Sequence, residues 1–543
     1  MDEGGGGPAD LVLTGGPVWS GAGVPTGVDR AVAMRDGRIL AVGGDREVRA
    51  LSGAGSRIVD VEGGLILPGF IDAHTHFLAG GFRLSAVQLR DACSPAEFTA
   101  RLAARAAASR EGEWILGGDW DHERWGGELP DRRWIDEVTP ANPVFVHRLD
   151  GHMALANTRA LERGGVDGAS RSPEGGLIVR DADGRPTGIL KDRAMRLVSQ
   201  RIPPPTDEAR DDALRAALRH AASVGITGVH DMGLGDWSHV ETCRRAEAAG
   251  ELTVRVTAYV PLTDWEELTE RLAAPGVGDG PWFRLGGLKA FLDGSLGSGT
   301  ALFEEPYGDP ATRGLVVAPP EELRPLVEAA DAEGLQVAVH AIGDRANRLL
   351  LDLFSAVADA HGPRDRRFRI EHAQHLRAED IPRFRALGVI PSMQPAHAID
   401  DGRWAEARIG RERCERAYAF RSLLDAGARP AFGSDWAIAP LDPLLGIYGA
   451  VERRPGAGRP PLGPPAAPPW VPAERLRLEE ALTAHTRDAA RAAFQEDRLG
   501  TLEPGKAADV VVLDRDPRKG DAEDLRTCGV RMTVAGGRVV FEA

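Results

Sequence analysis

Short apolar runs alternate with longer amphipathic stretches through the middle of the chain. Several of these stretches end in glycine, as in RHAASVG before Ile226 and SLLDAG before Ala428. Glycine just past a helix is a common C-terminal signal, and strands alternating with helices predict a parallel sheet. The strand candidates are LILPGFIDAHTH, GITGVHDM, LTVRVTAYV, FRLGGLKAFLDG, LQVAVHAIGD, FRIEHAQ, GVIPSMQP and RPAFGSDW. A closed barrel requires eight such units, so we predict an α/β fold with a (β/α)8 TIM barrel over residues 68–490.

The two ends of the chain have a different pattern. Residues 9–67 and the last forty or so residues contain short apolar runs separated by Asp-Gly and Gly-Gly pairs, which are typical of β-hairpins. Neither end has enough strands to bury both of its faces alone. We therefore predict that residues 1–67 and 491–543 together form one small β-sandwich.

A long insertion separates the first and second strand candidates. It covers residues 77–224, is rich in tryptophan and contains the phrase RLDGHMALANTRAL. We expect it to form a subdomain over the barrel mouth. The stretch 454–472 is rich in proline, which predicts an extended surface loop.

Composition narrows the classes of partner. The 543 residues carry a net charge of −15, which argues against nucleic acid, because its phosphates require clustered Lys and Arg. The four cysteines, Cys93, Cys243, Cys414 and Cys528, form no CxxC pair, so a reducing compartment fits. The start MDEGGGGPAD lacks the features of a signal peptide, and we find no apolar run of membrane-spanning length. We expect a cytoplasmic protein with a small-molecule substrate and no membrane or nucleic-acid partner; a homo-oligomer remains open.

The strongest local motif is His74-Thr75-His76 after the apolar run GFIDA. Side chains at positions i and i+2 of a strand point the same way, so both imidazoles can reach one metal ion. Neutral imidazole is a good ligand for zinc and similar ions. A chance pair is the alternative at this point, because HxH occurs by accident in many chains.

Four more polar residues lie in or at the ends of other strand candidates. They are Lys289, His340, His372 and Asp435. In a barrel the C-terminal ends of the strands converge on one active site. The alternative is a set of hydrogen-bonded core histidines with a buried Lys–Asp pair. Six potential ligands on five strands favour the metal site, because polar groups at such positions are costly unless paired or liganded.

These motifs resemble the amidohydrolase superfamily, and the flanking text is similar to its YtcJ-like branch. The similar phrases are LILPGFIDAHTHF, GGDWDHERWGG, HRLDGHMALANTRAL, LKAFLDGSLGS, VHAIGDRA, RIEHAQ, FGSDWAIAPLDPL and LGTLEPGKAADVVVLDRDP. They cover nearly the whole chain. The resemblance implies a metal-dependent hydrolase on a (β/α)8 barrel.

The resemblance also implies a role for each candidate ligand. His74 and His76 would hold the more buried ion, with Asp435 as a further ligand. His340 and His372 would hold a second ion, if one is present. Lys289 occupies the place where relatives carry a lysine that CO2 converts into a carbamate bridging two ions. We therefore expect one or two divalent ions per chain, with zinc favoured by the histidines and carboxylate.

The implied reaction is hydrolysis of a C–N bond by metal-activated water, since a divalent ion lowers the pKa of its water from 15.7 to roughly 7. Asp435 would take the proton of the water and pass it to the leaving amine. An amide or N-substituted formamide is suggested by a characterised function within the YtcJ-like branch. The alternatives are a cyclic amidase, imidase or deaminase on the same site, and a catalytically idle regulatory or ligand-binding relative.

Substrate contacts are harder to assign. We interpret Trp120 and His152 of the insertion, and Asp344 after the fifth strand, as candidate substrate-binding residues, with core packing, a structural histidine and a loop cap as the alternatives. Glu371 is expected to point away from the site by strand alternation and to pair structurally. His230 is expected to support the ligands without binding metal.

Overall fold

The chain forms two compact units. The computed structural model describes residues 7–23, 30–148, 153–173, 176–233, 236–274, 276, 278–297, 299–308, 312–456 and 467–543. The first unit combines Met1–Leu78 with Ala217–Ala543, and the second is Ala79–Ala216. The chain passes from one unit to the other within helices α2 (Phe77–Ser85) and α7 (Asp207–Ser223).

The first unit is built around an eight-stranded parallel sheet. In order around the sheet, its strands are β6 (Phe70–Thr75), β13 (Ile226–Asp231), β14 (Arg255–Pro261), β15 (Phe283–Phe291), β16 (Val337–Ala341), β17 (Arg369–His372), β18 (Ile390–Met393) and β19 (Ala431–Phe432). A parallel bridge between Thr75 and Trp436 joins the first strand to the segment after the last, which nearly closes the barrel. Seven of the eight strand candidates contain one of these strands, and the remaining one, LTVRVTAYV, ends one residue before β14 does, so the predicted barrel is confirmed.

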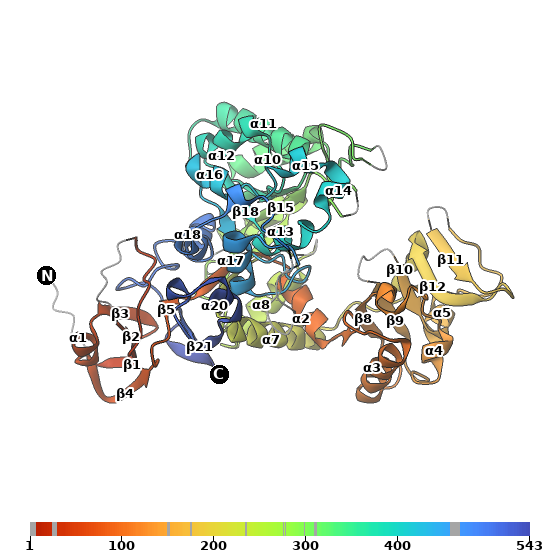
Figure 1. Ribbon diagram of the computed structural model, residues 1–543, viewed down its shortest axis with the longest axis horizontal. Helices are drawn as coiled ribbons and strands as arrows, with labels where there is room; N and C mark the ends of the chain where they lie inside the picture. Colours follow the sequence, from red (N-terminus) through yellow and green to blue (C-terminus); the bar gives the residue numbers. More distant parts are fainter. Residues whose placement is uncertain are drawn as a thin grey trace. The chain divides into compact units, whose positions relative to one another are not determined.

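Helices connect successive barrel strands, and α10, α11 and α12 gather outside the sheet (Figure 1). Gly225 before β13 and Gly427 before β19 have φ of +82° and +81°, as the glycine signals in the sequence predict. The helices after β13 are α8 (Ser238–Ala248), α9 (Trp265–Ala273), α10 (Pro320–Ala332), α11 (Asp344–His361), α12 (Ile381–Leu387), α13 (Pro395–Asp401), α14 (Ala405–Ile409), α15 (Arg411–Cys414), α16 (Phe420–Asp425), α17 (Pro443–Glu452), α18 (Leu478–Ala484), α19 (Arg487–Ala492) and α20 (Ala522–Thr527).

Both ends of the chain contribute to a β-sandwich. One sheet has the order β3 (Arg38–Gly43), β2 (Ala31–Arg35), β1 (Ala9–Thr14), β4 (Ser52–Asp60), with α1 (Asp45–Arg49) beside it. The other has the order β22 (Arg538–Glu542), β21 (Val530–Ala535), β20 (Val510–Leu513), β5 (Ile66–Pro68). Strand β5 is therefore the N-terminal strand that joins the C-terminal sheet, antiparallel to β20.

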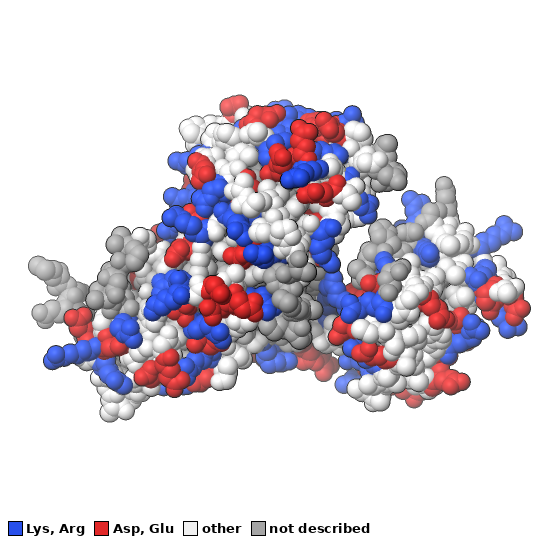
Figure 2. Space-filling view, in the orientation of Figure 1, with Lys and Arg blue, Asp and Glu red and all other residues white. Residues whose placement is uncertain are grey.

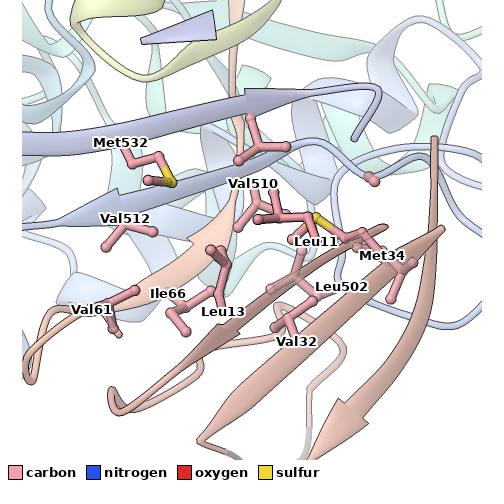
Figure 3. Packing of buried hydrophobic residues seen from close by; sticks show 13 residues of the cluster. Leu11, Leu13, Val32, Met34, Val61, Ile66, Leu502, Val510, Val512 and Met532 are labelled. Carbon is pink, nitrogen blue, oxygen red and sulfur yellow. The ribbon is translucent and has the colours of Figure 1, made fainter. Parts of the chain in front are cut away.

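The two sheets of the sandwich share one apolar core (Figure 3). Leu11 and Val32 from the N-terminal sheet and Val512 and Met532 from the C-terminal sheet belong to the same buried cluster. The hairpin turns are Asp36-Gly37, with φ of +52° and +72°, and Gly536-Gly537, with φ of +55° and +75°. Two consecutive positive φ angles are what a two-residue type I′ hairpin needs, which explains the Asp-Gly and Gly-Gly pairs.

The second unit contains a six-stranded sheet and its own core. The strand order is β11 (Gly176–Arg180), β12 (Pro186–Asp192), β10 (Met153–Ala156), β9 (Val144–Arg148), β8 (Ile115–Trp120), β7 (Val87–Gln88). Its helices are α3 (Pro95–Ala108), α4 (Arg133–Asp136), α5 (Thr158–Gly164) and α6 (Arg196–Ser199). This unit lies between β6 and β13 in the sequence, as the fold prediction placed its insertion. Part of the predicted Pro-rich loop, residues 457–466, lies outside the described residues.

Acidic and basic side chains are interspersed over the face of the molecule that Figure 2 shows. Where these charges are described, neither sign forms a large continuous patch on that face. Among the described residues, no helix is long and apolar enough to cross a membrane.

The shared sandwich core makes the N-terminal strands dependent on the C-terminal ones. A chain that ends after Gly505 loses β20, β21 and β22 and leaves the apolar faces of β1 and β2 uncovered. We expect this truncated protein to be insoluble on expression, because a large exposed apolar patch promotes aggregation.

The matched control ends after Gly537 and removes β22 alone, whose side chains are exposed or half-buried. It should stay in the soluble fraction. If the Gly505 truncation were soluble and active, the shared core would not be needed for folding.

Candidate metal centre

The two histidines of the HTH motif lie at the C-terminal end of β6, with one ring nitrogen of each already bonded. Nδ1 of His74 donates to Oε2 of Glu371 at 2.5 Å, and Nδ1 of His76 donates to the carbonyl of Gly233 at 2.7 Å. These bonds orient both rings and leave each Nε2 available to bind a metal ion. The two Nε2 atoms lie 3.6 and 3.4 Å from Oδ1 of Asp435, respectively. The motif therefore presents two imidazole nitrogens to one carboxylate.

Asp435 follows the short strand β19 and has a left-handed backbone, with φ of +59°. Its Oδ1 is shielded from solvent and has no hydrogen-bond partner among the described residues. Burial favours a raised pKa for this carboxyl, but the contact with His76 and the nearby His74 and His397 outweigh it and lower the pKa to about 2. The side chain is thus an ionised carboxylate with a buried oxygen that accepts no hydrogen bond from the described residues, which is costly unless a cation lies against it.

The carboxylate of Asp72 fixes the backbone at His74 and next to Asp435. It accepts hydrogen bonds from the backbone N–H of Ser434 at 2.9 Å and of His74 at 3.1 Å. The backbone N–H of Asp435 in turn donates to the carbonyl of His74 at 2.7 Å. Because these bonds join the first strand to the end of the last, closing the barrel also places Asp435 beside the HTH motif.

His340 and His372 lie on the adjacent strands β16 and β17, with ring centroids 4.5 Å apart. Nε2 of His340 donates to the carbonyl of Gly294 at 3.0 Å, and Nδ1 of His372 donates to Oε1 of Gln394 at 2.7 Å. Burial lowers the pKa of both imidazoles, with His340 near 4, and the proximity of Lys289 adds to this. Both rings are therefore neutral, which is the form that binds metal.

Lys289 is buried near these rings, with 6% of its surface exposed. Its Nζ has no hydrogen-bond partner in the described part of the chain and lies 4.7 Å from the ring centroid of Phe291. Burial lowers the pKa of this amine to about 8. An amine without partners in such a place is costly, so a chemical modification or a bound group would relieve it.

The assembled side chains have the composition of a site for a divalent cation. The ligand atoms of His74, His76 and Asp435 lie within 4.8 Å of one another, and so do those of His372, His397 and Asp435. Imidazole and carboxylate are the ligands found in catalytic zinc sites, and the orphan oxygen of Asp435 lies where an ion would satisfy it. The described residues therefore fit a divalent metal.

Glu371 has a role that the sequence interpretation missed, and its assignment to the opposite face is wrong. Strand alternation predicts that Glu371 and His372 point in opposite directions, but His372 has φ of +74° and leaves the strand conformation. Glu371 is fully buried and hydrogen-bonds to His74, while His372 also lies near His74, with ring centroids 5.1 Å apart. A carboxylate on the far nitrogen of a metal-binding histidine fixes the ring and raises its basicity.

Arg369 holds this carboxylate in place. Its guanidinium is fully buried and donates through Nε to Oε1 of Glu371 at 2.7 Å. Its Nη1 and Nη2 groups reach residues on four other strands. Their partners are the carbonyl of Ala73 (2.6 Å), the hydroxyl of Tyr259 (2.9 Å), Nδ1 of His230 (2.9 Å) and the hydroxyl of Ser392 (2.9 Å). His230 therefore supports this network beneath the site. No motif in the sequence indicates Arg369, because arginine inside a strand has many possible uses.

His397 is another residue that sequence reasoning missed. It lies in α13, just after β18, and its ring stacks on His372 with centroids 6.5 Å apart and 16° between the planes. Its only signal in the sequence is its position in QPAH, directly after a strand candidate. The direction of a side chain in a helix or loop is harder to predict from sequence than that of a side chain at a strand end.

Two of the three candidate substrate contacts are described, and both are held by contacts within the fold. Trp120 is fully buried in the core of the second unit and donates through Nε1 to the carbonyl of Val146 at 2.9 Å, so packing accounts for it. Asp344 begins α11 and accepts a hydrogen bond from the backbone N–H of Glu304 at 2.9 Å, as a loop-fixing residue would. His152 lies outside the described residues.

Comparisons with known proteins agree on one family. A model described as "Amidohydrolase family" matches residues 57–541. Protein LONG AFTER FAR-RED 3 of Arabidopsis thaliana is 41% identical over 98% of this chain and 92% of its own length. The putative amidohydrolase YtcJ of Bacillus subtilis is 31% identical over 97% and 99% of the two chains. The N-substituted formamide deformylase of Arthrobacter pascens is 29% identical over 94% and 95%.

Solved structures give the same picture. The chain is similar to the crystal structure of an uncharacterized metal-dependent hydrolase from Pyrococcus furiosus, with a TM-score of 0.76 and 30% sequence identity. The likeness covers 94% of this chain and all of that one.

Because Glu371 accepts a hydrogen bond from His74, we expect its charge to affect the affinity of the site for zinc. Glu371→Gln preserves the size of the side chain but removes the charge that orients His74 and neutralises Arg369. We expect zinc affinity to fall by about 10–100-fold, as is typical when an outer partner of a ligand is replaced. Titration of the metal-depleted protein with zinc against a competing chelator measures the change.

The control is Ser392→Ala, which removes another partner of Arg369 without touching His74. Its zinc affinity should change much less. Wild-type zinc affinity in Glu371→Gln would show that the carboxylate does not support the ligand.

Proposed function

The chain belongs to the amidohydrolase family and is a metal-dependent hydrolase, and on that premise we propose that it cleaves a C–N bond with water. The proposed substrate is an amide or N-substituted formamide with an apolar substituent on nitrogen. One observation carries the proposal: the carboxylate of Asp435, whose buried Oδ1 has no hydrogen-bond partner among the described residues, lies beside the two Nε2 atoms of the HTH motif. That arrangement puts a proton acceptor next to a cation site, as hydrolysis requires.

We assign the ligands of the first ion as His74, His76 and Asp435, and we place His340, His372 and Lys289 around a second. When bound, such an ion supplies Lewis acidity, which makes water more acidic and a carbonyl carbon more electrophilic. Zinc is the metal favoured by the imidazole and carboxylate ligands. Glu371 and Gln394 hold the rings of His74 and His372 in the orientation that presents Nε2 to the site.

Asp435 is the proposed proton carrier. Its carboxylate takes a proton from the attacking water as the water oxygen bonds to the substrate carbonyl carbon. The tetrahedral intermediate then collapses, the C–N bond breaks, and the same proton passes to the leaving nitrogen. With a formamide the products are formate and an amine, and Asp435 returns to its ionised form. Its buried position excludes bulk water from competing for the proton.

Lys289 is proposed to carry a carboxylate added by CO2. The neutral amine would attack CO2, form an N–C bond and release one proton to solvent. The buried Nζ without a hydrogen-bond partner supports this, because the carbamate would give the site a negative charge and two ligand oxygens. An unmodified ammonium beside two cations would be strongly disfavoured.

The apolar substituent is inferred from the rim of the barrel. Phe291 ends β15, is 45% exposed, and its ring centroid lies 5.3 Å from that of His340. A large exposed apolar side chain next to a polar site offers a surface for an apolar substrate group. The formamide itself is suggested by the name of the Arthrobacter pascens relative.

Asp435→Asn tests the mechanism. The substitution retains the side-chain size and one carbonyl ligand but removes the base. We expect kcat for release of formate from an N-aryl or N-alkyl formamide to fall by about 10²–10⁴-fold. Zinc content should fall much less, because His74 and His76 remain.

The comparison variant is His74→Ala, which should lower both zinc content and kcat. Near-normal turnover by Asp435→Asn would exclude this residue as the base. A wild-type protein that binds zinc but releases no formate from any of these substrates would overturn the substrate class and leave the metal centre standing.

A further inference from the structure

We propose that His397 is a metal ligand and that, with His372 and Asp435, it forms the second cation site. The inference rests on the proposed function, because it concerns the same barrel mouth. It adds His397 and a shared Asp435 to His340, His372 and Lys289, the residues assigned to the second ion from the strand ends. Asp435 would then be shared, with one carboxylate oxygen available for each ion.

Distance supports the assignment. The ligand atoms of His372, His397 and Asp435 all lie within 4.8 Å of one another, the same limit that the HTH motif and Asp435 satisfy. Ligand atoms bound tetrahedrally to zinc at roughly 2.1 Å are about 3.4 Å apart. A modest inward movement of the side chains would therefore complete the site.

The unsatisfied nitrogen of His397 supports it independently. Nε2 is shielded from solvent and has no hydrogen-bond partner within the described ranges. A buried polar atom without a partner costs free energy, and coordination to a cation would remove that cost. Oδ1 of Asp435 also has no hydrogen-bond partner among the described residues, so two atoms of the cluster that could bind a metal are unsatisfied.

The local sequence explains why this histidine is aimed at the site. Helix α13 begins directly after β18, at the catalytic end of the barrel, and Gln394 is its N-cap residue. Gln394 and His397 are three positions apart, which places them on one side of the first turn. Gln394 accepts the hydrogen bond from Nδ1 of His372 at 2.7 Å, and His397 stacks on the same ring. One helical turn therefore both orients His372 and supplies a further nitrogen.

The experiment is a metal titration of the full-length, metal-depleted protein with Zn²⁺ in equilibrium dialysis. We expect about two ions per chain in the wild type. In His397→Gln the second ion should bind at least about tenfold more weakly, since even loss of an outer partner of a ligand has that effect. The matched control is His375→Gln, which removes another buried imidazole with an unpartnered Nδ1 that belongs to neither ligand group.

A second experiment looks for a new absorption band, whereas the first looks for weaker zinc binding. In His397→Cys loaded with two equivalents of Co²⁺, a thiolate-to-cobalt charge-transfer band should appear, because a soft thiolate at position 397 would bind the ion directly. The wild type and His375→Cys should lack this band. The readout requires metal binding but not catalytic activity.

The outcomes separate the two proposals. Two zinc ions bound with wild-type affinity in His397→Gln, together with no band in His397→Cys, would overturn the role of His397 and leave the hydrolase proposal intact. Weakening of the second ion to the same extent in His375→Gln would also overturn it, because a residue outside the site would then have the same effect. Absence of bound Zn²⁺ in the wild type would overturn the proposed function itself.

Discussion

The buried ion pair between Arg369 and Glu371 is the interaction on which the rest of the site depends. Both side chains are fully buried, so neither charge can be left without the other. Removing one partner of such a pair typically costs about 3–5 kcal/mol. The guanidinium also bonds to Ala73, Tyr259 and Ser392, and so it ties strands from opposite sides of the barrel together beneath the site. Oε2 of Glu371 also accepts the hydrogen bond from Nδ1 of His74, which leaves Nε2 of His74 for the proposed metal ion.

Above this layer, backbone conformation determines which side chains reach the mouth. His372 and Asp435 both have positive φ at the ends of their strands, a conformation that costs energy for residues with a Cβ. The surrounding hydrogen bonds, including those of Asp72 to the N–H groups of His74 and Ser434, hold this region in place. The result is a cluster of imidazoles around one ionised carboxylate, in which burial keeps His74, His340 and His372 neutral, and a cation would stabilise this arrangement.

The sequence predicts the barrel better than the candidate site, because the barrel follows from local signals whereas the site depends on contacts that form only in the folded chain. Apolar runs, glycine signals and Asp-Gly turns are local, so the eight strands and the two-ended sandwich could be predicted from them. Candidate ligands at strand ends could be chosen because the strand ends of a barrel converge. Glu371 could not, since a positive φ at the next residue breaks the alternation that was applied to it. His397 and Arg369 depend on which elements meet in space, and the packing of Trp120 in the second unit depends on the core around it.

The most direct test of the account is element-specific anomalous diffraction from crystals of the purified protein, recorded at the zinc absorption edge. We expect a strong peak bounded by His74, His76 and Asp435, with the Nε2 atoms of both histidines directed at it. Two observations in crystals grown with zinc would together contradict the claim that this barrel mouth is a metal centre. They are the absence of an anomalous peak at this location and an ion pair between Asp435 and an unmodified Lys289.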